Sequence, residues 1–213
     1  MSVIVIVIAL FAAVFLAVGW VWRVRHRSMR RAARATCASL PAPGSPCDLV
    51  GTAVPLRPAP FSGTPCAWYR VRATAKTPSG KNTFLDEKSD APFYLEDHTG
   101  RLAIHPEHAF MDGPVRTFDE RRATNGTLPG TSGEVGEYHY EEWTLPAGTS
   151  VYVLGTSANG TIGKDPEIGQ YTISTRDARA YRRRAVLFMA VGYGTGALLV
   201  ALAALLVIVD HIT

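Results

Sequence analysis

The residue types best suited to metal chemistry gather between residues 96 and 108. They are three carboxylates and three histidines: Glu96, Asp97, His98, His105, Glu107 and His108. A zinc site needs three or four ligands that converge on one point, usually with paired cysteine or histidine spacing. His98 and His105 lie at opposite ends of a short hairpin, where each residue adds about 3.3 Å, so their rings are not expected to meet. We therefore expect exposed polar residues here, with no metal and no other cofactor.

Three cysteines, Cys37, Cys47 and Cys66, are the other reactive groups. Cys66 opens a strand that should be half-buried, and buried cysteines are usually inert. No histidine is spaced to activate it. Three cysteines allow at most one internal disulfide, which is no disulfide framework. We expect reduced structural thiols and no cysteine nucleophile.

Motifs for other chemistries are missing from the sequence. It contains no phosphate loop, dinucleotide fingerprint or nucleophile elbow. Tyr69, Tyr94 and Tyr152 have faces on which bases or sugars could stack. Residues 47–175, however, carry 11 Lys and Arg against 16 Asp and Glu, and this acidic balance argues against a nucleic acid partner. No catalytic residue is assigned, and the chain is expected not to be an enzyme.

The element that positions the acidic and histidine residues is a predicted hairpin over residues 92–110. Apolar residues alternate with polar ones over 93–96 and again over 101–105, as in two strands with one buried face. Residues 97–100 supply the turn, because Asp bonds its own backbone and Gly accepts left-handed conformations. The candidate interaction surface follows the polar side of this hairpin: Tyr94, Glu96, His98, Arg101, His105 and His108.

Further strands are predicted over 48–54, 66–74, 150–155 and 170–174. Short strands divided by Gly, Pro and Asn turns are typical of a sandwich or a small barrel. The order strand, long excursion, hairpin, strand, strand resembles a five-stranded OB-type barrel. The predicted domain is therefore an all-β, OB-like small barrel over residues 47–175, with mobile polar loops over 76–91 and 117–138.

Two apolar segments enclose this domain. Residues 3–22 and 185–209 contain no charged residue, and about 20 apolar residues suffice to cross a bilayer core of about 30 Å. The first segment lacks the basic start and the small-residue cleavage site of a signal peptide, so we expect a retained anchor. Basic helices are predicted over 23–40 and 176–184, with a Pro-rich linker over 41–46. The fold class is a membrane protein with a β domain between two transmembrane helices.

Charge is distributed unevenly around the two spans. Half of the 22 Lys and Arg residues flank the spans on the side of the β domain, and neither far end carries one. The positive-inside rule then places the β domain in the cytoplasm and both termini outside. The Arg clusters are suited to anionic lipid headgroups. The expected location is a bacterial plasma membrane.

Gly192 and Gly196 have GxxxG spacing within the second span, which permits close helix packing. This face would either join two copies in a homodimer or pack the chain's own two spans together. The sequence leaves both possibilities open.

Four motifs resemble, in order, the GIDE or BAM domain family. They are CDLVGTAVP, FSGTPCAWYRVRA, PFYLEDHTGRLAIHPEHA and YEEWTLPAGTSVYVLGTSA. The family includes Mulan-type membrane-anchored E3 ubiquitin ligases and prokaryotic relatives, and the resemblance covers about residues 47–175. It implies a domain held between two spans. The chemistry of these ligases resides in a RING finger with eight Cys or His ligands, which this sequence does not supply, so it resembles a prokaryotic-type member that lacks the RING.

The resemblance and the anchors together predict a non-enzymatic interaction, sensor or scaffold module with an unidentified protein partner. Two alternatives stay open. One is an accessory subunit of a ubiquitin-ligase-like enzyme, and the other is an OB-type binder of nucleic acid or glycan.

Overall fold

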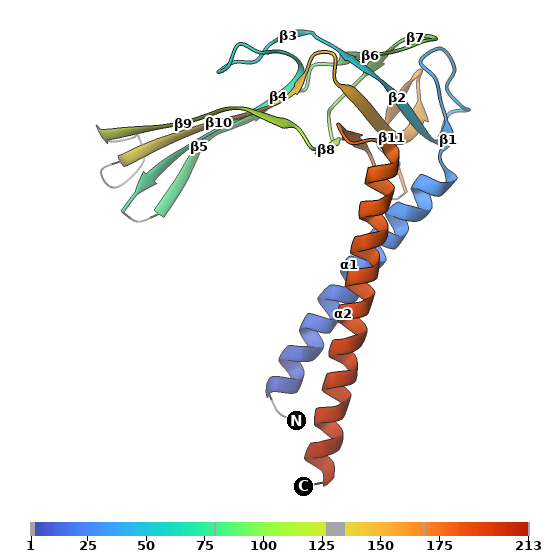
Figure 1. Ribbon diagram of the computed structural model, residues 1–213, viewed down its shortest axis with the longest axis vertical. Coiled ribbons are helices and arrows are strands. Elements are labelled where there is room, and N and C mark those ends of the chain that lie inside the picture. The colour runs from blue at the N-terminus through green and yellow to red at the C-terminus, as the bar shows by residue number, and fades with distance from the viewer. Residues whose placement is uncertain (1–2, 79, 127–134, 168, 213) are drawn as a thin grey trace. The chain divides into compact units, whose positions relative to one another are not determined.

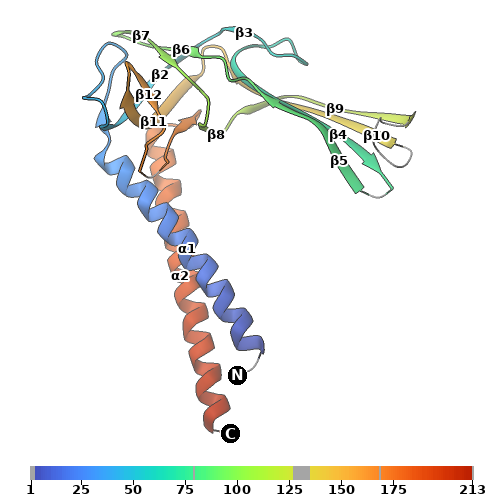
Figure 2. The same cartoon turned by 180° about the vertical axis from the view of Figure 1, so that it is seen from behind.

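The computed structural model describes residues 3–78, 80–126, 135–167 and 169–212. The chain divides into two compact units. The helical unit consists of Met1–Ala32 and Ala178–Thr213, and the β unit consists of Ala33–Asp177 (Figures 1 and 2).

The helical unit contains α1, Val3–Arg31, and α2, Ala178–Ile212. Both helices, the second as far as Val209, are long and apolar enough to cross a membrane. The apolar segments 3–22 and 185–209 lie within them, so the two predicted spans are present as candidate membrane helices. The chain thus has the features of an integral membrane protein.

Glycines allow α1 and α2 to pack closely. A Cβ atom on Gly192 would lie 2.7 Å from the backbone nitrogen of Gly19, and one on Gly196 would lie 2.8 Å from the side chain of Leu16. A larger residue at either position would overlap its neighbour at these distances, so the two glycines allow the backbones of α1 and α2 to approach each other. The GxxxG face therefore packs the chain's own helices together, and a homodimer through the same glycines stays a prediction.

The basic helix predicted over 23–40 ends earlier, at Arg31. Beyond it, β1, Ala33–Arg34, pairs parallel to the first long strand of the β unit. Ala35 and Cys37 are buried in the core of that unit. Burial of these side chains outweighs helix propensity, which is a weak preference. The second basic segment, predicted as a helix over 176–184, forms the first turns of α2 from Ala178 onward, and Arg176 and Asp177 precede the helix.

The described strands of the β unit form two sheets. The first contains β2 Pro46–Val54, β6 Phe93–Asp97, β7 Gly100–Ile104, β8 Phe110–Asp112, β11 Ser150–Ala158, β12 Thr161–Gly163 and β13 Thr172–Ser174. Their order is β7-β6-β2-β11-β13-β8, with β1 beside β2 and β12 beside β11. The second contains β3 Arg57–Pro58, β4 Pro65–Thr77, β5 Gly80–Lys88, β9 Val115–Gly126 and β10 Val135–Pro146. Their order is β3-β4-β10-β9, with β5 beside β4.

The apolar core lies mainly on the first sheet. Phe93, Leu95 and Val153 are fully buried there. Trp68 of β4 and Leu145 of β10 belong to the same cluster, so the second sheet is attached to the core by one end. Complete burial of an apolar side chain of this size stabilises a fold by roughly 1.5–3 kcal/mol.

Beyond this core, β4, β5, β9 and β10 continue as a long four-stranded ribbon, here termed the arm (Figures 1 and 2). β4 and β10 pair antiparallel from Cys66 and Pro146 to Lys76 and Glu137. In β5 every side chain except that of Leu85 is exposed. Exposure of both faces means that no second layer of described residues covers the arm at this strand.

The expected OB-like barrel is not formed, because neither sheet closes in the part of the chain that is described. β4, which a barrel would need beside β2, belongs to the second sheet instead. The first sheet curls, since Oγ1 of Thr161 in β12 donates to the carbonyl oxygen of Ala103 in β7 at 2.6 Å. No ladder pairs β12 with β7, so the curl does not become a barrel.

The segments 76–91 and 117–138, predicted as mobile loops, are largely strands β5, β9 and β10. Residues 127–134 of the second segment lie outside the described residues. The prediction was wrong for β5 because this strand is exposed on both faces and has no apolar side, so its polarity resembles that of a loop. The strands predicted over 48–54, 66–74 and 150–155 are confirmed as β2, β4 and β11.

Replacing Gly192 with leucine is expected to destabilise the helical unit by roughly 1–3 kcal/mol, because the new side chain would overlap the backbone of Gly19. Equilibrium unfolding of the full chain in detergent micelles measures this loss. The matched control is Gly194→Leu, since a Cβ atom there meets nothing within 4 Å. Equal stability of the two variants would contradict intramolecular packing, and a loss that grows on dilution would indicate a homodimer instead.

Candidate functional site

The predicted hairpin is confirmed, and part of the candidate interaction surface lies together on it. β6 and β7 pair along their whole length, which leaves His98 and Thr99 as a two-residue loop. Tyr94, Glu96 and Arg101 are exposed. Glu96 and Arg101 face each other across the ladder, and Nη2 of Arg101 lies 3.2 Å from Oε2 of Glu96.

The three histidines of the candidate surface lie apart from one another. His98 is in the loop, His105 follows the far end of β7, and His108 lies beyond it with a φ of 61°. Nε2 of His108 is 3.3 Å from Oε1 of Glu107. Within the described residues, no three His, Cys, Asp or Glu side chains are grouped so that they could hold a metal ion. The hairpin therefore presents a small polar surface.

Asp97 fastens this hairpin to the segment that follows α1. Its Oδ1 accepts hydrogen bonds from the backbone nitrogen of Thr99 at 2.7 Å and from Oγ1 of Thr99 at 2.6 Å. Its Oδ2 accepts one from the backbone nitrogen of Cys37 at 2.9 Å. The hydrogen bonds from Thr99 and then those from Cys37 hold the pKa of Asp97 well below its usual range.

The three cysteines are all free and buried. Burial raises the pKa of the Cys37 and Cys47 thiols to about 11, and it also raises the pKa of Cys66. Near neutral pH the groups are therefore thiols rather than nucleophilic thiolates. Sγ of Cys37 donates to the carbonyl oxygen of Leu95 at 3.3 Å, a structural contact of the predicted kind.

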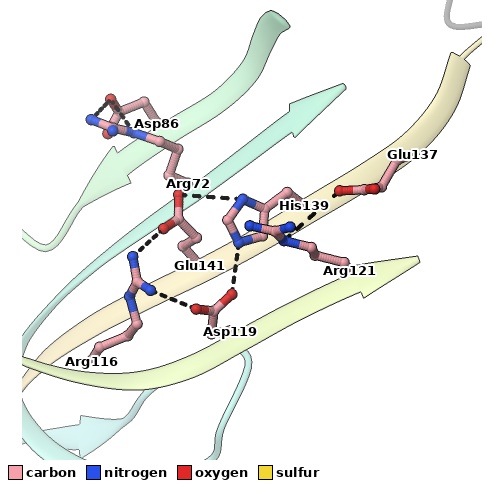
Figure 3. A network of polar contacts seen from close by, with 8 residues as sticks. All are labelled: Arg72, Asp86, Arg116, Asp119, Arg121, Glu137, His139 and Glu141. Atoms are coloured by element: carbon pink, nitrogen blue, oxygen red, sulfur yellow. Dashed lines mark hydrogen bonds and ion pairs between the residues drawn. The ribbon is translucent and has the colours of Figure 1, made fainter. Parts of the chain in front are cut away.

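One face of the arm carries a network of charged side chains (Figure 3). Its members are Arg72, Asp86, Arg116, Asp119, Arg121, Glu137, His139 and Glu141. Arg116 of β9 contacts both Asp119 and Glu141. The ladder places Glu141 opposite Arg72 of β4 on one side and opposite Asp119 of β9 on the other. We call this side the charged face.

His139 is the member of the network with the clearest potential for acid–base chemistry. Its Nε2 lies 2.7 Å from Oδ1 of Asp119, and its Nδ1 lies 3.9 Å from Oε2 of Glu141. The hydrogen bond from His139, with smaller contributions from nearby arginines, holds the pKa of Asp119 below its usual range. A hydrolytic triad places a nucleophile at one ring nitrogen. Here both nitrogens face carboxylates, so His139 belongs to a cross-strand network of polar contacts.

The opposite side of the arm carries a row of aromatic rings, which we call the aromatic face. Phe61, in the loop between β3 and β4, has its ring centroid 5.6 Å from that of Phe118 and 5.9 Å from that of Tyr140. Phe84 of β5 lies 5.8 Å from Tyr138 and 6.4 Å from Tyr140. The tyrosines alternate along β10 with His139 and the glutamates of the network, so they point to the other side of the sheet.

A buried carboxylate holds Phe61 in this row. Glu142 is 0% exposed, and its Oε2 accepts a hydrogen bond from the backbone nitrogen of Phe61 at 2.7 Å. Its Oε1 accepts hydrogen bonds from Oγ of Ser62 at 2.5 Å and from Oγ1 of Thr117 at 2.8 Å. These donors compensate for the desolvation of the carboxylate. Glu142 therefore connects β10 to β9 and to the loop that bears Phe61.

Sequence reasoning misses both faces of the arm, because most of their residues fall in the segments expected to be loops. A signal was available. From Glu137 to Glu141, charged or imidazole side chains alternate with Tyr138 and Tyr140, which is the period of a strand.

Two candidate spanning helices joined to an open β-sheet unit define the chain as a membrane protein with a β domain outside its spans. The sequence model of the GIDE family, described as an E3 ubiquitin ligase, matches residues 69–203. The match extends from β4 into α2 and covers more than half of the chain, so the chain belongs to the GIDE family. No curated protein and no solved structure matches it.

Acidification is expected to release the contacts of Asp97. Because its pKa is lowered in the folded state, the carboxylate stabilises the fold above its unfolded pKa, and this contribution is lost as the pH falls towards the folded value. Asp97→Asn should therefore be less stable than the natural chain at neutral pH, and the difference should shrink below about pH 4.

Thermal unfolding between about pH 7 and about pH 2 measures this difference. The matched control is Asp90→Asn, which removes the charge of an exposed aspartate elsewhere in the β unit. A stability difference for Asp97→Asn that stays constant over the whole range would contradict the assignment.

Proposed function

We propose that the chain is a membrane-anchored, non-enzymatic interaction module that docks a protein partner on the aromatic face of its arm. The observation that carries the proposal is a row of five aromatic rings on a sheet whose strand β5 is exposed on both sides. Phe84 is 44% exposed and the other four rings are half-buried, so the row remains partly accessible. Grouped accessible rings mark binding surfaces, and truncation of Tyr or Trp anchors accounts for much of the binding energy in protein complexes.

The surroundings of the rings favour a protein partner. Phe61 is fixed by Glu142, so the row is organised before binding and loses little conformational freedom on docking. Glu120 and Arg122 pair beside the rings, with the Arg122 guanidinium 5.6 Å from the Tyr140 centroid, and they supply a polar rim. The hairpin surface with Tyr94, Glu96 and Arg101 stays a prediction for a second contact.

In this proposal the two apolar helices anchor the module in a bacterial plasma membrane. The concentration of Arg beside the spans favours a cytoplasmic β unit with both termini outside, and it favours contact with anionic headgroups. Tethering raises the effective concentration of the arm near membrane partners, which suits a scaffold or a sensor.

Photo-crosslinking in cells that express the full chain tests the docking surface. Benzoylphenylalanine in place of Phe84 should give a discrete adduct with another protein. Tyr138→Ala in the same chain should reduce the adduct strongly, because truncation of an aromatic anchor costs about 2 kcal/mol, or about 30-fold in affinity.

The matched control carries benzoylphenylalanine in place of Lys81, on the same strand and beside the charged face. It should give no adduct with that protein. An adduct that is insensitive to Tyr138→Ala, or common to both positions, would contradict docking on the aromatic face.

The identity of the crosslinked protein also tests the orientation of the β unit. A cytoplasmic protein is expected, and a protein from the other side of the membrane would contradict a cytoplasmic β unit.

Membership in a family described as an E3 ubiquitin ligase supports a second candidate, an accessory role in ubiquitin transfer. The purified chain in vesicles, mixed with ubiquitin, an activating enzyme, conjugating enzymes and ATP, separates the two. A non-enzymatic module should leave ubiquitin conjugation at the level of empty vesicles. Conjugation that depends on the chain would support the ligase class and contradict the first proposal.

A further inference from the structure

A cavity of about 330 Å³ lies where the two sheets of the β unit meet. β4, β5 and β10 form one side of it, and the segment of residues 109–114, which includes β8, forms the other. It opens on the charged face, since Trp143 and Arg70 are opposite each other in the ladder and share the side of Arg72 and Glu141. The cavity is thus separate from the aromatic face.

Aromatic rings line the cavity. Trp68 is only 4% exposed and belongs to the core, so it provides a rigid wall. Trp143 has two guanidinium neighbours, that of Arg72 at 5.7 Å and that of Arg116 at 5.4 Å from its ring centroid. Phe110, 52% exposed, stands at the rim. These rings give the cavity a partly apolar wall.

Cations line the same cavity. Nε and Nη2 of Arg70 donate to the two carboxylate oxygens of Asp86, both at 2.7 Å. Arg72 donates to Oδ2 of the same Asp86, with its Nη2 at 3.1 Å. Lys88, opposite Arg70 in the ladder, has no ion-pair partner among the described residues. The described residues that line the cavity include three cations, Arg70, Arg72 and Lys88, and no carboxylate. Asp86 pairs with the two arginines, and Glu141, opposite Arg72 in the ladder, pairs with Arg116. The cavity therefore keeps an excess of positive charge.

We propose that this cavity binds a small ligand that joins a phosphate or carboxylate group to a planar apolar body. The planar part packs against the wall that contains Trp68, Trp143 and Phe110, and the anion binds Lys88 and the guanidinium groups that Asp86 now occupies. Guanidinium groups match both anions by paired hydrogen bonds. The volume is at the lower end for ligand sites, which suits one aromatic ring with its anionic group rather than a polymer.

The test uses the full chain in nanodiscs of zwitterionic lipid, labelled with 5-fluorotryptophan. Two of the four tryptophans, Trp68 and Trp143, line the cavity, and the other two, Trp20 and Trp22, lie on α1 and serve as an internal reference. Phenyl phosphate or benzoate is the probe. The expected result is a saturable shift of the Trp68 and Trp143 fluorine signals, with a Kd of about 1 mM, while the other two signals stay fixed.

Two further compounds test the contributions of the anionic group and of the ring separately. Inorganic phosphate carries the anion alone and benzyl alcohol carries the ring alone, and each should bind about tenfold more weakly than phenyl phosphate. A shift by phenyl phosphate, by benzoate or by both supports the proposal and identifies the anion accepted. No saturable shift with either, or an equal shift with benzyl alcohol, would overturn it.

Variants on β5 locate the anion. Lys88→Gln removes a cation without breaking the bridges to Asp86 and should weaken phenyl phosphate binding about tenfold. Asp86→Asn frees the two guanidinium groups and should strengthen it. Lys81→Gln, on the same strand but outside the cavity, is the matched control and should have no effect. Unchanged fluorine spectra without ligand verify folding, and equal affinities of the Lys88 and Lys81 variants would overturn the proposal.

Discussion

The buried carboxylate of Glu142 is the interaction on which the arm depends. It collects hydrogen bonds from the loop before β4 and from β9 while it is itself part of β10. An unpaired carboxylate is costly to bury, so these donors must be in place whenever the arm is folded. One side chain therefore fixes the spacing of three chain segments, beside the buried Val71 that lies opposite it in the ladder.

The open sheet that results divides its two sides between different chemistries. Side chains of odd-numbered positions on β10, such as His139 and Glu141, join the charged face, and Tyr138 and Tyr140 join the aromatic face. A closed barrel would have buried one of these sides. Because the arm extends from the core by one end, both sides are available, and a partner on one side need not exclude a ligand on the other.

The sequence was sufficient where burial imposes a pattern. The spans follow from long charge-free stretches, and the β6–β7 hairpin follows from alternation around a turn whose Asp97 bonds to Thr99. The sequence was insufficient where burial leaves no periodic pattern or where it overrides the local pattern. β5 is exposed on both sides, so its sequence predicts a loop. The segment after Arg31 has the composition of a helix, although Ala35 and Cys37 are buried in the core of the β unit. Barrel closure depends on which strands pair at long range, which local periodicity does not encode.

The outer strands of the arm raise a question of solubility. β5 pairs with β4, β9 pairs with β10, and the described residues supply no strand for the other side of either. An unpaired edge is a template for strands of other molecules, and proteins commonly protect such edges with charge. β5 carries Lys81, Asp86 and Lys88, and β9 carries Arg116 and Arg121. The charged residues that made these segments resemble loops in the sequence thus discourage edge-to-edge aggregation of a sheet whose strand β5 is exposed on both sides.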